Sequence, residues 1–240
     1  MKKTKLNFKR YEKKYLLSAA QYELLWQELS GRIRPDEYFQ STVCSLYYDT
    51  DSFELIRHSI EKPVFKEKLR LRSYGVPEVG DEVFVELKKK FKGVVYKRRI
   101  KLTEAEAESW LAGRGGIPED TQTCREIDWF LHRYRPVPKV YIACDREAYV
   151  ATDDPELRFT FDRDIRWRGD ELSLCAGSHG ENLTEPGQVL MEIKLQGAAP
   201  LWLADMLSRL EIFPVGFSKY GNCYKNELIE KYFNGVMEFA

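Results

Sequence analysis

The runs KEKLRLRSYG (residues 66–75) and EVFVELKKKFKGVVYKRRI (residues 82–100) decide the fold of this chain. Successive side chains of a β-strand point to opposite faces of the sheet, and both runs alternate charged with apolar residues. Arg70 and Arg72 share one face, and Leu71 between them points to the other. The pattern predicts three successive strands with one charged face and one apolar face.

The charged face is strongly basic. In the second run Glu86 and Lys88 share a face, as do Lys97 and Arg99 after the turn at Gly93. Residues 62–101 hold 13 Lys or Arg and 5 Asp or Glu, a net charge of +8 in a chain whose total is zero. Like charges on neighbouring strands repel each other. The sequence therefore leaves two alternatives open, a solvated basic face and a surface that binds a polyanion.

Composition limits the class of protein. The chain has 240 residues and 43% hydrophobic residues, enough for a substantial core. We find no linker, composition break or repeat, so we expect one domain over residues 1–240. No apolar run is long enough to span a bilayer, and the basic N-terminus lacks the apolar stretch of a signal peptide. Five cysteines without metal-ligand spacing fit a reducing cytosol, and zero net charge argues against general nucleic-acid binding.

The whole chain predicts an α+β fold with about eight strands. Ser18 and Thr103 are predicted helix N-caps, residues 32–40 a loop, and residues 169–187 a flexible loop. Almost every predicted strand carries charge on one face and apolar residues on the other. A single sheet with one wet face would satisfy this pattern. A closed antiparallel β-barrel, with a polar basic bore and helices packed outside, satisfies it better because it also removes exposed edges.

Eight short motifs occur in an order that resembles a known family. They are RYEKKY (10–15), SLYYDT (45–50), KLRLRSYG (68–75), FVELKKK (84–90), YKRRI (96–100), DREAYV (145–150), MEIKL (191–195) and FSKYGN (217–222). Together they resemble the VTC domain, the polyphosphate polymerase catalytic domain of the triphosphate tunnel metalloenzyme, or CYTH-like, superfamily. The resemblance covers residues 8–224 and implies an eight-stranded antiparallel barrel around a triphosphate tunnel.

The resemblance also implies an activity. A domain of this kind transfers the γ-phosphate of ATP to a growing inorganic polyphosphate chain and releases ADP, with Mn²⁺ or Mg²⁺ as cofactor. Carried over position by position, the catalytic residues are Arg70, Arg72, Lys88 and Lys219. The phosphate-binding residues are Lys14, Arg10, Lys97, Arg99, Arg146, Arg158 and Lys194. The metal ligands are Glu192 and, as a second carboxylate, Glu86.

One departure separates branches of the superfamily. Hydrolase and cyclase members open with Glu-x-Glu-x-Lys, whereas this chain reads Arg10-x-Glu12-x-Lys14. A cation thus replaces a carboxylate that could bind metal or position water, which favours the polymerase. Two alternatives stay open: a tunnel tri- or polyphosphatase, and a non-catalytic subunit that binds polyphosphate.

The expected partners follow from the same resemblance. They are ATP and inorganic polyphosphate, with no nucleic acid. We expect no SPX-like regulatory region before the barrel and no membrane span after it, so regulation and translocation would need other chains, among them a membrane protein. The expected location is cytoplasmic, peripheral at the inner face of a membrane through that partner. The sequence leaves the oligomeric state open.

Overall fold

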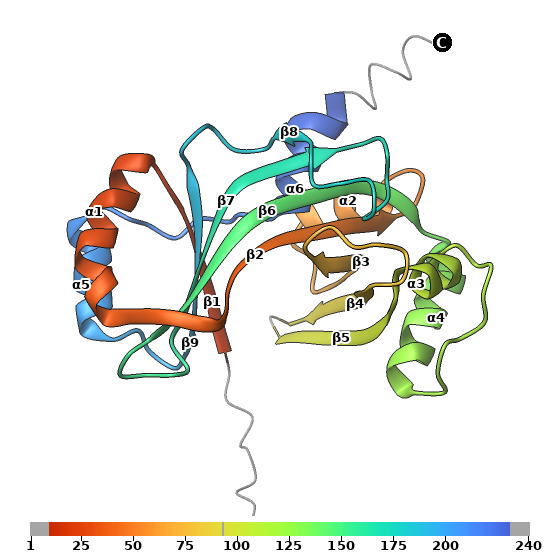
Figure 1. The fold of residues 1–240 in the computed structure, drawn as a ribbon, viewed down its shortest axis with the longest axis horizontal. Helices are drawn as coiled ribbons and strands as arrows, with labels where there is room; N and C mark the ends of the chain where they lie inside the picture. The colour runs from red at the N-terminus through yellow and green to blue at the C-terminus, as the bar shows by residue number, and fades with distance from the viewer. Residues whose placement is uncertain (1–9, 93, 231–240) are drawn as a thin grey trace, which may run out of the picture. The chain divides into compact units, whose positions relative to one another are not determined.

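The computed structural model describes residues 10–92 and 94–230, and the side chain of Arg10 lies outside the described part. Figure 1 shows the order of the elements along the chain. They are β1 (Arg10–Leu17), α1 (Ala19–Leu29), a 3₁₀ turn (Ser30–Arg32), β2 (Ile33–Asp49), α2 (Glu54–Ile60), β3 (Phe65–Tyr74), β4 (Glu82–Phe91), β5 (Val94–Thr103), α3 (Glu104–Leu111), α4 (Gln122–Tyr134), β6 (Val137–Ala151), β7 (Arg158–Arg168), β8 (Glu181–Asn182), β9 (Val189–Gln196), α5 (Leu201–Arg209), α6 (Lys219–Cys223) and a π-helical turn (Tyr224–Leu228).

The strands belong to one antiparallel sheet with an open order. That order is β1-β9-β7-β6-β2-β3-β4-β5, and β8 pairs with β7. Within the described residues the path does not return from β5 to β1. The structure therefore confirms an α+β fold dominated by an antiparallel sheet, and it does not confirm closure of that sheet into a barrel.

Contacts divide the chain into two compact units, which are described separately. Within the described residues, the first unit consists of 10–41, Asp145–Asp164 and Thr184–Phe217. The second unit consists of 42–92, 94–144, Ile165–Leu183 and 218–230. The long strands β2, β6 and β7 each contribute a segment to both units.

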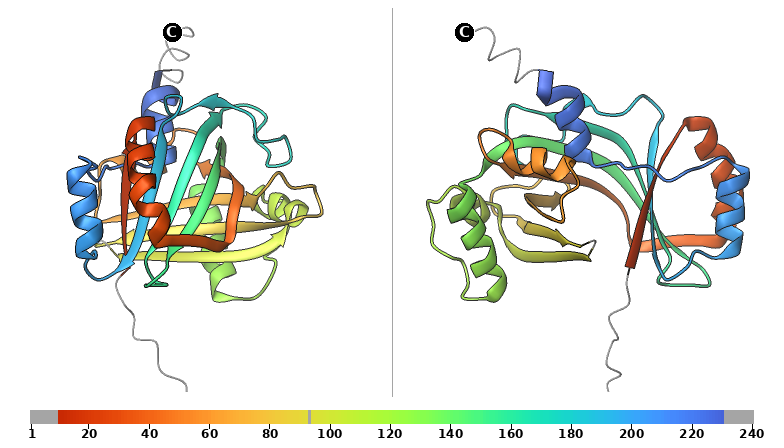
Figure 2. Two further views of the ribbon diagram at one scale, coloured as in Figure 1. Left: turned by 60° about the vertical axis from the view of Figure 1, so that its left-hand side comes forward. Right: turned by 180° about the vertical axis from the view of Figure 1, so that it is seen from behind.

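The first unit packs α1 and α5 together over its part of the sheet (Figure 2). The predicted N-cap is confirmed, because the Ser18 hydroxyl accepts a hydrogen bond from the Gln21 backbone N–H and Gln21 Oε1 accepts one from the Ser18 backbone N–H. The buried core includes Leu25 of α1, Phe159 and Phe161 of β7, and Met191 of β9. These apolar side chains leave the opposite face of β1, β7 and β9 to charged residues.

The second unit contains the three predicted basic strands. Figure 1 shows β3, β4 and β5 in succession, with α3 and α4 beside them. Leu69, Leu71 and Val85 are buried with Ile127 and Phe130 of α4. The apolar face of this hairpin series therefore packs against the helices.

Lys89 and Arg98 lie on the helical side of the same strands, as their alternation predicts. Both contact the carboxylate of Glu126 in α4, Lys89 Nζ at 3.5 Å and Arg98 Nε at 3.1 Å. The remaining cations of β3–β5 are thereby assigned to the other face.

Two segments predicted as loops have more structure than the sequence indicated. Residues 33–40 were expected in a loop and instead form the first half of β2. Their side chains are mostly exposed and show no clean alternation, so pairing of the backbone, rather than burial of one face, makes this segment a strand.

Within residues 169–187, the buried Arg168 guanidinium donates hydrogen bonds to the backbone carbonyls of Glu171, Ser173, Gly177 and His179. One side chain thus organises the turn that follows β7.

None of the helices in the described part of the chain is both long enough and apolar enough to cross a lipid bilayer.

Candidate functional site

A buried carboxylate lies at the centre of the basic face of the second unit. Strand pairing aligns Arg70 of β3, Glu86 of β4 and Arg99 of β5 in one row across the sheet. The neighbouring row is Lys68, Lys88 and Lys97. We name Glu86 and the four cations that approach it the Glu86 cluster; its cations are Arg70, Arg72, Lys97 and Arg99.

The contacts of Glu86 are short and come from three sides. Its Oε2 accepts a hydrogen bond from Arg70 Nε at 2.7 Å, and its Oε1 accepts from Arg99 Nε at 2.6 Å and lies 2.7 Å from Lys97 Nζ. Arg72 Nε is more distant, at 3.9 Å. Glu86 itself is only 1% exposed. Both carboxylate oxygens are thus occupied by cations.

Electrostatics keep Glu86 ionised. Burial alone would raise the pKa of Glu86, but the charges of Arg70 and Arg72 and the hydrogen bond from Lys97 outweigh burial, and the pKa lies far below its usual range. A divalent cation at this carboxylate would meet four positive side chains. The geometry therefore makes Glu86 a counter-charge that orients these cations.

Two tyrosines hold the far ends of the two arginines. Arg70 Nη1 donates to Tyr47 Oη at 3.2 Å, and Arg99 Nη2 donates to Tyr74 Oη at 3.2 Å. Each guanidinium is therefore held by both Glu86 and a phenol. Neither tyrosine was a candidate from the sequence. The role of Tyr47 depends on the strand register, which places it opposite Arg70.

The surroundings of Tyr47 make its phenol unusually acidic. Burial raises the pKa of Tyr47, but the charges of Arg70, Lys68 and Arg72 and the hydrogen bond from Arg70 lower it to about 8. Its neighbour Tyr48, equally buried on the opposite face of β2, has a raised pKa because burial and the charges of Glu108 and Glu104 outweigh the charge of Arg114.

We predict that one phenol of this protein ionises near pH 8 and that this ionisation step is absent in Tyr47→Phe. The physical reason is that the three cations stabilise the phenolate. A spectrophotometric titration of phenolate absorbance would measure it. The matched control is Tyr48→Phe, which should leave the low transition in place. A titration of Tyr47→Phe that superimposes on that of the unsubstituted protein would contradict the prediction.

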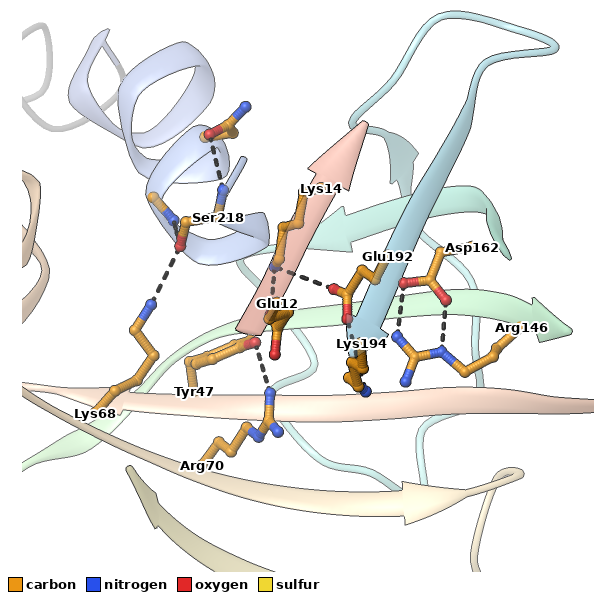
Figure 3. Close-up of polar contacts among 12 residues, drawn as sticks. Glu12, Lys14, Tyr47, Lys68, Arg70, Arg146, Asp162, Glu192, Lys194 and Ser218 are labelled. Atoms are coloured by element: carbon orange, nitrogen blue, oxygen red, sulfur yellow. Dashed lines mark hydrogen bonds and ion pairs between the residues drawn. The ribbon is translucent and has the colours of Figure 1, made fainter. Parts of the chain in front are cut away.

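Lys68 and Lys219 lie at the same end of the second unit. Lys68 Nζ is 5.7 Å from the ring centre of Tyr47 and 5.5 Å from that of Tyr220, and it donates to Ser218 Oγ at 3.3 Å (Figure 3). Ser218 caps α6, so Lys219 begins that helix directly beside the Lys68 contact. Tyr220 stacks on Tyr47 and donates to Asp49 Oδ2 at 2.8 Å. The buried Asp49 thus holds the Tyr220 ring that Lys68 faces.

The first unit carries a second polar group, centred on Lys14. Lys14 Nζ lies 3.0 Å from Glu192 Oε1 and 3.7 Å from Glu12 Oε1 (Figure 3). Lys194 Nζ is 3.9 Å from Glu192 Oε2. Strand pairing explains the arrangement, because Lys14 is opposite Glu192 and Glu12 is opposite Lys194.

The other candidates of the first unit are paired with carboxylates. Arg146 makes a two-pronged contact with the fully buried Asp162, with Nε–Oδ1 and Nη2–Oδ2 distances of 2.6 and 2.7 Å (Figure 3). Arg158 is half exposed, and its Nη1 lies 3.5 Å from Asp36 Oδ2. Arg10 begins β1, but its side chain lies outside the described residues.

The donor set around Lys14 fits a divalent cation that also binds phosphate. Mg²⁺ and similar ions commonly use one or two protein carboxylates together with water and substrate phosphates. Glu12 and Glu192 supply two carboxylates within reach of one ammonium group. The described residues contain no cluster of three or more acidic, His or Cys side chains that would form an all-protein metal cage. The residues present therefore suit a shared protein–phosphate metal site.

Comparisons with known proteins agree on the family and the fold. The VTC domain model matches residues 9–227. Two curated relatives are called vacuolar transporter chaperone complex subunit 4: one from Trypanosoma brucei brucei is 25% identical, and one from Trypanosoma cruzi is 27% identical. Each match covers 76% of this chain and only 28% of the relative.

A solved structure shares the fold. A Bacillus halodurans protein, provisionally assigned as an adenylate cyclase, superposes with a TM-score of 0.50 at 16% identity and covers 86% of this chain and 92% of its own. The family model spans nearly all of the described residues, including both polar groups described above. The chain therefore belongs to the VTC domain family.

Proposed function

We propose that this chain is a polyphosphate polymerase domain that transfers the γ-phosphate of ATP to an inorganic polyphosphate chain and releases ADP. The observation that carries the proposal is the Glu86 cluster in a VTC domain, with two arginines fixed by one carboxylate and two tyrosines. The closed eight-stranded tunnel that the resemblance implies remains part of the proposal.

Oriented cations suit phosphoryl transfer. Such reactions ask the protein chiefly for positioning and for stabilisation of charge on phosphate oxygens. A guanidinium grips two oxygens at once, and an ammonium group supplies a mobile point charge. Arg70, Arg72 and Arg99 would hold phosphate groups, while Lys68 and Lys88 supply charge beside them. The acceptor is already an anion, so the reaction needs no general base.

The first unit would hold the cofactor. Glu192, with Glu12 beside it, would bind Mn²⁺ or Mg²⁺, which when bound neutralises charge on phosphate oxygens. Lys14 Nζ lies 3.0 Å from Glu192 Oε1 and would bind phosphate beside it. Arg146, fixed by Asp162, and the more exposed Lys194 and Arg158 would add phosphate contacts.

The partners follow from the relatives. The matched proteins are named as subunits of a vacuolar transporter chaperone complex. By analogy, this chain would act in the cytoplasm beside membrane-protein partners that move the product. This chain spans 28% of the length of those relatives.

Incubation of the purified protein with ATP and Mn²⁺, followed by ³¹P NMR, tests the proposal. We expect signal from internal phosphates to appear together with a matching amount of ADP. Free orthophosphate without internal phosphate would overturn the polymerase in favour of a hydrolase. Unchanged ATP, with tripolyphosphate still raising the melting temperature, would overturn it in favour of a binding subunit.

A further inference from the structure

Thr160 of β7 carries a buried hydroxyl group without a partner. The residue is 8% exposed, and its Oγ1 makes no hydrogen bond within the described part of the chain. A buried polar group left in this state destabilises the fold by more than a hydrogen-bonded one. A valine has nearly the same shape, favours strands and carries no hydroxyl. Packing alone therefore does not account for a threonine at this position.

The neighbours of Thr160 point to a ligand. Thr160 pairs with Glu192 across β7 and β9, and Glu192 pairs with Lys14 across β9 and β1. Directly opposite residues of antiparallel strands share a face, with Cβ atoms about 4.5–5.5 Å apart. Lys14, Glu192 and Thr160 thus form one row on one face of the sheet, and the carboxylate of Glu12 approaches the same Lys14 ammonium group (Figure 3).

The chemistry of the row selects the ligand. Hydroxyl and carboxylate oxygens are hard donors of the kind that Mg²⁺ and Mn²⁺ prefer. A hydroxyl with a free lone pair can bind such an ion or hold one of its water molecules.

We propose that Thr160 is an oxygen donor of the divalent-cation site formed with Glu192 and Glu12. This inference rests on the metal-dependent part of the proposed function. It predicts opposite effects of one substitution: Thr160→Val removes an unpaired buried hydroxyl and so stabilises the metal-free protein, while it weakens binding of the cation.

Binding of Mn²⁺ alone, followed by electron paramagnetic resonance of the free ion, tests this inference on the full chain. We expect the dissociation constant for Mn²⁺ to rise about tenfold in Thr160→Val and to stay within about twofold in Thr160→Ser, which restores the hydroxyl. The melting temperature of metal-free Thr160→Val should rise by about 2–4 °C. Unchanged Mn²⁺ affinity, or a lower melting temperature, would overturn the assignment of Thr160.

Two further variants show whether a negative result excludes only Thr160 or the whole metal site. Thr152→Val removes a hydroxyl that donates to the Arg32 carbonyl at 3.1 Å, so it should lower the melting temperature and leave Mn²⁺ affinity unchanged. Glu192→Gln should lose Mn²⁺ binding. If Glu192→Gln binds Mn²⁺ as tightly as the unsubstituted chain, the whole metal site is overturned. If only Glu192→Gln weakens binding, the metal site stands and Thr160 is excluded from it.

Discussion

Glu86→Ala is expected to lower the free energy of unfolding by about 3–5 kcal/mol, the usual cost of removing one partner from a buried ion pair. The carboxylate is 1% exposed and lies between Arg70, Lys97 and Arg99. Without it these cations repel one another at short range. Urea unfolding at neutral pH would measure the change.

An added polyanion should reverse much of this loss. Tripolyphosphate would supply the missing negative charge, so it should raise the melting temperature of Glu86→Ala by more than that of the unsubstituted protein. Glu67→Ala is the matched control: Glu67 is also buried in the second unit, but it faces Lys89 on the helical side. Glu67→Ala should lose stability, and tripolyphosphate should not raise its melting temperature by more than that of the unsubstituted protein. Equal rescue of both variants would show that tripolyphosphate does not replace the Glu86 carboxylate.

The stabilisation of the fold by Glu86 depends on pH with a definite sign. The pKa of Glu86 is depressed in the folded protein, so its contribution to stability is complete above the ordinary glutamate value of about 4.3. It is lost progressively as the pH falls from there toward the depressed folded-state value. The stability difference between the unsubstituted protein and Glu86→Ala should therefore be largest at neutral pH and shrink in acid. A difference that grows below pH 4 would contradict the assigned charge state.

Glu192→Gln is expected to reduce polyphosphate synthesis by on the order of a thousandfold, because neutralisation of phosphate charge by a bound divalent cation is worth several kcal/mol. The substitution keeps the size of the side chain and removes its charge. The rate of internal-phosphate formation from ATP and Mn²⁺, followed by ³¹P NMR, would measure the effect. Far-ultraviolet circular dichroism should show that the fold persists.

The control for this variant is Glu37→Gln, an exposed carboxylate of β2 in the same unit. It should synthesise polyphosphate at the rate of the unsubstituted protein. Synthesis by Glu192→Gln at that same rate would remove Glu192 from the metal site and the first unit from the proposed chemistry.

Much of the fold was readable from alternation alone. The run from Lys66 to Arg99 gave three strands with the correct faces, because a period of two residues fixes which side chains are buried once one face meets helices. Alternation also separated Lys89 and Arg98 from the cations of the Glu86 cluster. It failed for residues 33–40, where the strand is held by backbone pairing and neither face is consistently buried.

The sequence identified the charged residues of the candidate site, but it did not show which of them pair across the strands. Parity grouped Arg70 with Arg72, Glu86 with Lys88, and Lys97 with Arg99, each within one strand. The register that aligns these pairs with one another depends on how the three strands pair. The family resemblance suggested Glu86 as a second metal ligand, which stays a prediction, and the structure surrounds this carboxylate with cations. The same limitation hid Tyr47, whose role depends on its position opposite Arg70.

The carboxylate of Glu86 has a further consequence for a polymer that has to move. A strip of unopposed arginines would retain a polyanion wherever it first touched, whereas conduction requires binding that is favourable enough to enter and weak enough to leave. Each cation of the cluster already has a partner to return to when a phosphate departs. Under the proposed function, the fixed negative charge would lower the energy barrier between successive phosphate positions, so that a bound polyanion could move along the basic face instead of staying where it first touched.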